Sequence, residues 1–356
     1  MKSLRKFPDP FLAEIVAQPA ALRRAALGVG EQSESLQRLA EVEPLAPIVF
    51  TGMGASYDAC YAPVTLFCGA GRNASMVDAS ELLHFRRAML RAGTILVAVS
   101  QSGESAEIVR LVGALPDGAR PLLVSVTNGM ANPLAGAADV PLDTRAGAEV
   151  GPSTISFGAT LVVLAALADV LSGVPSYSVA VHTLEESEEA AAAAERILID
   201  PEDEARRFRS WLGSRQTVTL LGRGTARSAS EAGSLILKEA ARLPVEALAA
   251  AQFRHGPLEL AGPGIAVAIV ATEPETVSLD LRLAGELLDV GAAVMVVGAT
   301  GRAPGGAVAV DVGSPARALA PAVAVVPFQL LAWWLAVEQG LDPGVLAIAS
   351  KVTTRE

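Results

Sequence analysis

Two short stretches of small polar residues have the composition of an anion-binding site. The sequence Gly-Met-Gly-Ala-Ser occupies residues 52–56, and Ser-Gln-Ser-Gly-Glu-Ser occupies residues 100–105. Each stretch follows an apolar run expected to be a strand and precedes a stretch expected to be a helix. Backbone N–H groups at a helix N-terminus and serine hydroxyls donate hydrogen bonds to anions. The two loops therefore predict a phosphate site without a lysine of the Walker type.

The elements that must position these loops can be read from the hydrophobic pattern. Residues 47–50, 95–99 and 122–126 are short apolar runs without alternation, which is typical of strands buried on both faces. Helical stretches are expected between them at 57–69, 105–114 and 156–171. The sequence therefore predicts an α/β protein with parallel strands joined by helical crossovers.

An internal repeat extends this prediction to the whole chain. Residues 217–226 repeat the pattern of 48–56, which aligns Gly222 with Gly52 and Gly224 with Gly54. Two further strand segments align in the same order and with nearly the same separation between the copies. We therefore expect two tandem doubly wound domains, each a flavodoxin-like three-layer αβα unit with a parallel sheet.

The expected boundaries follow from the repeat. They are an N-terminal helical segment at 1–45, a first domain at 46–183, a helical linker at 184–213, a second domain at 214–342 and a C-terminal active-site tail at 343–356. After its second strand the second copy has Ala-Thr-Glu-Pro at residues 271–274 instead of the serine-rich loop. We therefore expect only the first domain to bind phosphate.

Composition excludes several classes of protein. A chain of 356 residues suggests two domains, and its net charge of −10 argues against a nucleic-acid partner. The two cysteines, Cys60 and Cys68, form neither a disulfide framework nor a metal motif, so both are expected to be core residues and no metal or other cofactor is expected.

The sequence shows no secretory signal, and one apolar segment imitates a membrane span. The N-terminus has no apolar signal region, so a cytoplasmic location is expected. Residues 318–337 are nearly all apolar and are long enough to cross a bilayer. Because the segment contains Pro321, Pro327 and Gln329 and has no basic flank, a buried core helix is expected and no membrane partner.

The two loops, together with Gly-Ala-Glu-Val-Gly-Pro-Ser-Thr at residues 147–154, resemble the sugar isomerase (SIS) domain family. Over roughly residues 10–356 the chain is similar to the isomerase half of glucosamine-6-phosphate synthase and to related sugar-phosphate deaminases. The resemblance implies a sugar-phosphate substrate. It also implies that Glu149 and Ser153 contact the substrate, although Glu149 has the alternative of bonding only to loop backbone. The residues that it implies for the phosphate are Gly54, Ser56, Ser100, Gln101, Ser102 and Ser105.

A second family signature lies in the second copy. Leu-Lys-Glu at 237–239 is followed further along the chain by Phe-Arg-His-Gly-Pro-Leu at 253–258. The resemblance implies that Glu239 shuttles a proton through an enediol or enamine, that His255 opens the sugar ring, and that Lys351 steadies developing charge. A plainer interpretation stays open, in which Glu239 and Lys238 form a solvated helix pair and His255 has a turn or capping role.

One departure from the family pattern and one feature of the N-terminus bear on the reaction. The family often has a lysine three residues before the catalytic glutamate, where this chain has Ile236. Residue 2 is lysine rather than a nucleophilic cysteine, so no glutaminase is expected. The expected activity is metal-independent deamination or aldose–ketose isomerisation of a hexosamine 6-phosphate. The alternatives are a deglycase of fructosamine-type 6-phosphates and a non-catalytic sugar-phosphate sensor.

The resemblance also implies the form of the assembly. In the family the histidine-bearing loop reaches into the active site of a neighbouring chain, and the apolar composition leaves surface for a large interface. A homodimer with shared active sites is therefore expected.

Overall fold

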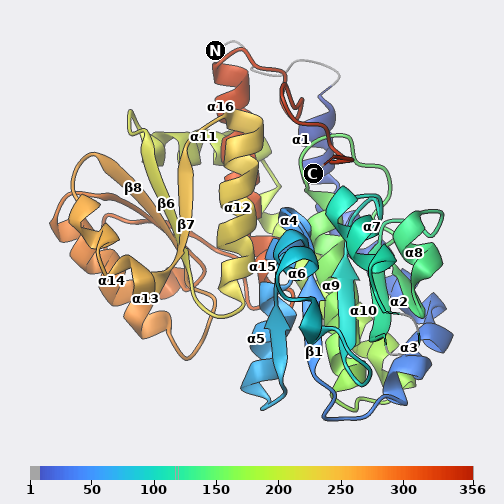
Figure 1. Cartoon of the computed structure of the whole chain (residues 1–356). Coiled ribbons are helices and arrows are strands. Elements are labelled where there is room, and N and C mark those ends of the chain that lie inside the picture. Colours follow the sequence, from blue (N-terminus) through green and yellow to red (C-terminus); the bar gives the residue numbers. More distant parts are fainter. Residues whose placement is uncertain (1–8, 117, 119, 356) are drawn as a thin grey trace. The chain divides into compact units, whose positions relative to one another are not determined.

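The computed structural model describes residues 9–116, 118 and 120–355, which form two compact units (Figure 1). The first unit comprises residues 20–148, 155–188 and the C-terminal residues from 348 onward. The second unit comprises the residues up to 19, residues 149–154 and residues 189–347. Each unit contains one sheet, and each is described by itself below.

The sheet of the first unit is entirely parallel, as expected. Every residue of β1 and β3 is buried, because helices cover both faces of the sheet. Phe50 of β1 is in register with Val97 of β3, which is in register with Val124 of β4. The strand order is β2-β1-β3-β4-β5, the flavodoxin order. The strands are β1 (Ile48–Thr51), β2 (Ala74–Met76), β3 (Ile95–Val99), β4 (Leu122–Thr127) and β5 (Val140–Asp143).

Helices form the outer layers of the first unit. Val49, Leu96 and Leu123 point to one face of the sheet and pack against Ile108 and Leu111 of α7. On the other side α9 contacts α3, α4 and α5. The helices are α2 (Gln18–Glu31, from residue 20), α3 (Ser33–Ala40), α4 (Ala55–Ala59), α5 (Tyr61–Gly69), α6 (Ala79–His84), α7 (Ala106–Gly113), α8 (Pro133–Ala137), α9 (Ile155–Leu171) and α10 (Ser176–Ile197, up to residue 188).

The second unit repeats this architecture. Its strand order, β10-β9-β8-β6-β7, is the same as in the first unit when the strands are counted from β6, and all of its strand pairs are parallel. The two tandem α/β domains predicted from the repeat are therefore confirmed. The strands are β6 (Thr217–Gly222), β7 (Val245–Ala249), β8 (Ile265–Val270), β9 (Ala293–Val297) and β10 (Val308–Val310).

Helices also cover both faces of this second sheet (Figure 1). Ile265, Val267 and Ile269 of β8 pack against residues of α13 and α14, while α12 contacts β6, β7 and β8. The helices are α1 (Pro10–Val16), α11 (Pro201–Leu212), α12 (Ala226–Ala241), α13 (Ala250–Phe253), α14 (Val277–Asp289), α15 (Ala320–Ala324) and α16 (Val326–Glu338).

The apolar segment near residue 330 is a core element of the second unit. Among the described residues, Ala320–Glu338 has the length and composition of a membrane span, and 94% of its most apolar window is buried inside the fold. Two of its polar atoms have partners: the side-chain oxygen of Gln329 accepts a hydrogen bond from Gln18 at 2.7 Å, and the indole N–H of Trp333 donates to Asp9 at 2.6 Å. The side-chain nitrogen of Gln329 is buried without a hydrogen-bond partner among the described residues. The expectation of a buried core segment is confirmed, with a break between α15 and α16.

Two local expectations in the first unit were wrong. The helix expected over 57–69 is divided at Cys60 into α4 and α5, because Pro63 has no N–H to donate to the carbonyl of Ala59. Cys60 is buried, its thiol donates to the Ser56 carbonyl at 3.3 Å, and burial raises the pKa of the thiol. Cys68, expected in the core, is instead exposed in the last turn of α5.

Gly103 allows the loop after β3 to close against the loop after β4. Its φ is +65°, and a Cβ there would lie 1.9 Å from the side-chain oxygen of Asn132. That oxygen accepts a hydrogen bond from the Ala135 N–H at 2.9 Å and so caps α8, while the Leu134 N–H donates to the Gly103 carbonyl at 3.2 Å. Both the backbone conformation and the contact therefore require glycine.

We predict that Gly103→Ala lowers the free energy of unfolding by at least about 1–2 kcal/mol, the cost of left-handed backbone for an L-residue, with the Asn132 contact adding to it. The matched control is Gly113→Ala, at an exposed glycine at the end of α7 where a Cβ meets nothing within 4 Å. The control should be neutral or stabilising by up to about 1 kcal/mol. Urea denaturation of both variants measures the difference, and equal losses would show that Gly103 has no special role.

Candidate functional site

The two predicted loops lie at the point where the strand order of the first sheet reverses. β1 is bonded to β3 on one side and to β2 on the other, so the crossovers that leave β1 and β3 run in opposite directions. Such a divergence opens a crevice at the carboxyl ends of the strands, where ligands bind in doubly wound proteins. The fold therefore brings residues 52–56 and 100–105 to one edge of one sheet.

Hydrogen bonds within the loop Ser100–Ser105 fix its shape. The hydroxyl of Ser100 accepts from the Gly103 N–H at 3.1 Å and lies 3.3 Å from the hydroxyl of Ser105, and Ser100 is only 3% exposed. The hydroxyl of Ser102 accepts from the Glu104 N–H at 3.1 Å. Ser100 therefore organises the loop from inside, which the sequence pattern does not distinguish from ligand contact.

Other polar groups of the two loops are available to a ligand. The side chains of Ser56 and Gln101 are half-buried and have no hydrogen-bond partner within the part of the chain that the structure describes. Ser102 uses its oxygen as an acceptor, which leaves its hydroxyl proton free to donate. Neither loop contains lysine or arginine. An anion at this edge of the sheet would therefore meet neutral hydrogen-bond donors.

Tyr57 adds a donor that sequence analysis did not single out. It follows Ser56 in α4 and is half-buried beside Tyr61, with the ring centroids 6.2 Å apart. Burial, followed by the nearby acidic groups of Tyr61 and Asp78, raises the pKa of Tyr57 to about 12. The phenol therefore keeps its proton at neutral pH.

The C-terminal tail lies against the second of these loops. The N–H of Ala106, the first residue of α7, donates to the carbonyl of Thr353 at 3.0 Å. Within the tail, the hydroxyl of Ser350 donates to the carbonyl of Val352 at 2.7 Å. Lys351, which is half-buried, is thus two residues from a direct contact with the helix that begins after Ser105. The structure therefore brings the tail lysine and the predicted phosphate loops into the same unit.

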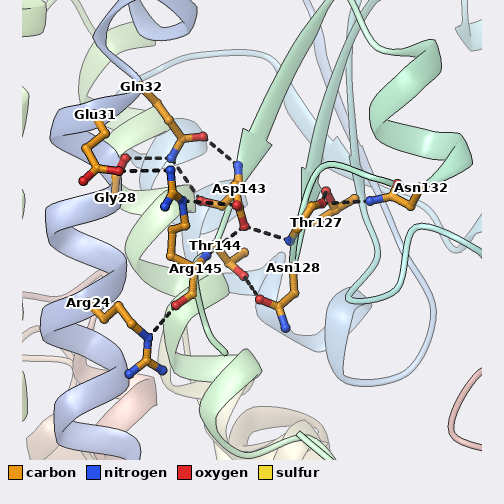
Figure 2. A network of polar contacts seen from close by, with 11 residues as sticks. Arg24, Gly28, Glu31, Gln32, Thr127, Asn128, Asn132, Asp143, Thr144 and Arg145 are labelled. Carbon is orange, nitrogen blue, oxygen red and sulfur yellow. Dashed lines mark hydrogen bonds and ion pairs between the residues drawn. The ribbon is translucent and has the colours of Figure 1, made fainter. Parts of the chain in front are cut away.

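A network of polar contacts supports the loops from the neighbouring strands (Figure 2). One oxygen of Asp143 accepts from the N–H groups of Gly129 and Arg145, at 2.8 and 2.9 Å. The side chain of Gln32, which lies between α2 and α3, donates to the Asp143 carbonyl and accepts from the Asp143 N–H, at 3.0 and 2.7 Å. The network reaches the predicted site because Asn128, beside Gly129, donates its backbone N–H to the Gln101 carbonyl at 2.9 Å.

Arg145 lies at the centre of this network in an unusual conformation. Its φ is +52°, and its guanidinium pairs with Glu31 at 2.9 Å and with Asp143 at 3.2 Å. Arg24 donates to its carbonyl at 2.8 Å. These residues line a pocket of about 550 Å³, together with Asn128 and others. The bonds of Arg145 hold a backbone conformation that costs free energy for a non-glycine residue.

The predicted catalytic residues Glu239 and His255 belong to the second unit. Glu239 is half-buried on α12, whereas the preceding Lys238 is exposed, as expected for neighbours about 100° apart on a helix. Ile236 is 2% exposed and belongs to the core. The position where the family often has a lysine therefore lies in apolar surroundings, where an unpaired ammonium would be costly.

His255 lies in the turn between α13 and the 3₁₀ helix Pro257–Leu260. Its backbone N–H donates to the Gln252 carbonyl at 2.9 Å, and its side chain is exposed. Within the described residues the imidazole has no hydrogen-bond or charged partner. This exposed ring is therefore available to a substrate or to another chain.

Glu149 and Ser153 lie in a loop whose shape depends on carboxylates. One oxygen of Glu149 accepts from the N–H and the hydroxyl of Thr154, at 2.8 and 3.2 Å. Glu14 of α1, which is 8% exposed, accepts from the N–H groups of Val150 and Gly151 at 2.5 and 3.3 Å. Glu149 thus bonds to loop backbone, and Glu14 is a positioning residue for which the sequence carried no signal.

Comparison with known proteins places the chain in a family. The SIS domain model matches residues 46–169 and 212–338. Glutamine–fructose-6-phosphate aminotransferase [isomerizing] from Pyrobaculum aerophilum is 30% identical over 355 residues, which cover 98% of this chain and 58% of that protein. The chain thus spans little more than half the length of this relative.

Two solved structures share the fold. The C-terminal domain of glucosamine-fructose-6-phosphate aminotransferase from Francisella tularensis superposes with a TM-score of 0.84 at 24% identity, over 96% of this chain and 99% of that one. Glucosamine-6-phosphate deaminase from Thermotoga maritima superposes with a TM-score of 0.72 at 19% identity, over 97% and 99%. Because the family model matches most of the chain and falls on both sheets, the chain belongs to the SIS domain family.

Proposed function

We propose that this chain is a phosphosugar isomerase that deaminates a hexosamine 6-phosphate to the ketose phosphate. The observation that carries the proposal is the set of unpartnered donors at the switch point of the first sheet, which within the described residues are the side chains of Ser56 and Gln101 and the hydroxyl proton of Ser102. These neutral donors, with the N–H groups of the loops, suit the three oxygens of a phosphate monoester. Because such a substrate is charged and intracellular, we also propose a cytoplasmic location.

The proposed reaction, deamination, is the reverse of the amino transfer to a ketose phosphate. The relative from Pyrobaculum is named for amino transfer to fructose 6-phosphate with isomerisation. A site that stabilises the transition state of one direction stabilises that of the reverse direction equally. In reverse, glucosamine 6-phosphate and water give fructose 6-phosphate and ammonia, so free ammonia is the expected product.

The proposed mechanism uses three groups of this chain. His255 transfers the proton that opens the sugar ring. Glu239 removes the proton from C2 of the open-chain aldehyde, giving an enaminol, and returns it to C1 to give the imine of the ketose. Water then hydrolyses the imine and releases ammonia. Lys351, held beside the phosphate loops by the tail, offsets the negative charge that develops on the C1 oxygen.

Buried Ile236 favours a second candidate, a sugar-phosphate sensor, because it stands where the family often has a lysine near the catalytic glutamate.

One assay separates the candidates. The protein is incubated with glucosamine 6-phosphate, with other hexose 6-phosphates and with a fructosamine-type 6-phosphate, and ammonia and ketose phosphate are measured. Ammonia from glucosamine 6-phosphate supports the deaminase, turnover of only the fructosamine adduct supports a deglycase, and saturable binding without turnover supports the sensor.

For the phosphate loops, we predict that Ser56→Ala or Ser102→Ala weakens sugar-phosphate binding by about 1–3 kcal/mol, the range for losing a hydrogen bond to a charged group. The control is Thr272→Ala at the corresponding loop of the second unit, where the hydroxyl is buried without a hydrogen-bond partner in the described part of the chain. This variant should bind normally. Calorimetry with glucosamine 6-phosphate measures the affinity of all three variants. An equal loss of affinity in Thr272→Ala would show that the first unit is not the special phosphate site.

For the proton transfers, we predict that Glu239→Gln keeps the fold and the ligand affinity while turnover falls by roughly 10²-fold or more. His255→Ala should slow reaction from the cyclic sugar more than from an open-chain analogue, because only the former needs ring opening. Steady-state rates with both substrates measure the contrast. A variant at His255 that slowed both substrates equally would contradict the ring-opening role.

We further propose a homodimer in which Glu239 of one chain and His255 of its neighbour complete each site. The exposed imidazole of His255, which has no partner among the described residues, supports this arrangement. Mixing Glu239→Gln and His255→Ala chains, after dissociation and reassociation, should restore about a quarter of the wild-type sites. Half of the dimers would be mixed, each with one intact site. Absence of activity despite demonstrated chain exchange would place both groups on the same chain.

A further inference from the structure

The second unit retains the backbone of the first phosphate loop. Residues 223–225 connect β6 to α12 as residues 52–54 connect β1 to α4. The aligned glycines have nearly the same φ, 53° at Gly224 and 54° at Gly54. The loop of the second unit therefore leaves the carboxyl end of its strand with the same positive φ at glycine as the loop of the first unit.

This second loop is already occupied by a carboxylate. Glu273, in the loop after β8, is 3% exposed, and its Oε1 accepts from the N–H of Thr225 at 2.6 Å and from the Thr225 hydroxyl at 2.5 Å. A Cβ on Gly224 would lie 2.8 Å from the same oxygen, so the carboxylate lies directly against the glycine. In the alignment of the two copies, Glu273 takes the place of Ser102.

Charged side chains complete this internal anion site. Arg317 pairs with the other oxygen of Glu273 at 2.5 Å and with the exposed Glu275 at 3.0 Å. The guanidinium of Arg223, in the same loop as Thr225, forms its ion pair with Asp280 instead, at 2.7 Å. Asp280 is 1% exposed, and burial raises the pKa of its carboxyl group despite the pairing with Arg223. The N–H, hydroxyl and guanidinium donors that would suit a phosphate are thus all engaged by the chain's own Glu273.

We propose that Glu273 is a built-in anion that fills an oxyanion site in the second domain and excludes phosphate from it. Because the carboxylate is tethered, its effective concentration at the loop exceeds that of a free ligand. Removal of this carboxylate would open a site for a small oxyanion, bound by Thr225 and Arg317. The role of Glu273 does not depend on the function proposed above. That function decides only how many phosphate ions the wild-type chain binds.

The experiment titrates inorganic phosphate into wild-type protein and Glu273→Ala by calorimetry. The variant should bind one more phosphate per chain than the wild type, whatever number the wild type binds, and phosphate should raise its melting temperature more. Glu275→Ala is the matched control, because it removes the other carboxylate on Arg317 without touching Thr225; it should gain no site. Glu273→Gln retains one oxygen and the volume of the side chain, so it should also gain no site.

The outcomes distinguish this proposal from the proposed function. A folded Glu273→Ala variant that binds no additional phosphate overturns the built-in anion, as does an added site that survives Thr225→Ala. If Glu273→Ala does not fold in phosphate-free buffer, refolding with phosphate or formate should restore it, and refolding insensitive to both would also overturn the proposal. A failure of the proposed phosphate site in the first domain would be seen in a different measurement. In that case Ser56→Ala and Ser102→Ala would bind sugar phosphate as tightly as the wild type does.

Discussion

Burial of both faces of each parallel sheet is the constraint on which the rest of the molecule depends. Parallel strands must be joined by crossovers, so the loops that leave their carboxyl ends gather at one edge. The strand order then decides which of these loops diverge, and in both sheets the divergence falls between the first and third strands. The strand order alone therefore places side chains that are far apart in the sequence, such as Ser56 and Gln101, at the same edge of the sheet.

The two domains show how one backbone supports opposite local chemistry. In the first, serine and glutamine side chains at the switch point keep hydrogen-bonding capacity that the described part of the fold does not consume. In the second, a buried glutamate consumes the equivalent capacity and brings Arg317 with it. The same edge of the fold thus carries serine and glutamine side chains in one domain and a hydrogen-bonded glutamate in the other, with Glu273 at the position that aligns with Ser102.

The strands, the repeat and the loops were predictable because they depend on short-range patterns. Fully apolar runs such as residues 95–99 identify buried parallel strands, and the repeated glycines identify the second domain. The structural role of Ser100 and the burial of Glu14 were not predictable. The former is decided by a turn geometry, and the latter by contacts with residues 136 and 137 positions away. The exposure of Cys68 was missed because the prediction rested on residue type, and free cysteine is usually buried.

The interleaving of the two units along the chain bears on how the protein is made. The N-terminal segment packs against α16, near the other end of the chain, through the Asp9–Trp333 and Gln18–Gln329 hydrogen bonds. Thr353, in turn, bonds to a helix of the first unit. Contacts of such sequence separation form slowly because loop closure must precede them. Each unit is thus completed by segments that are far apart in the sequence, so its last contacts close only after the elements between those segments have formed.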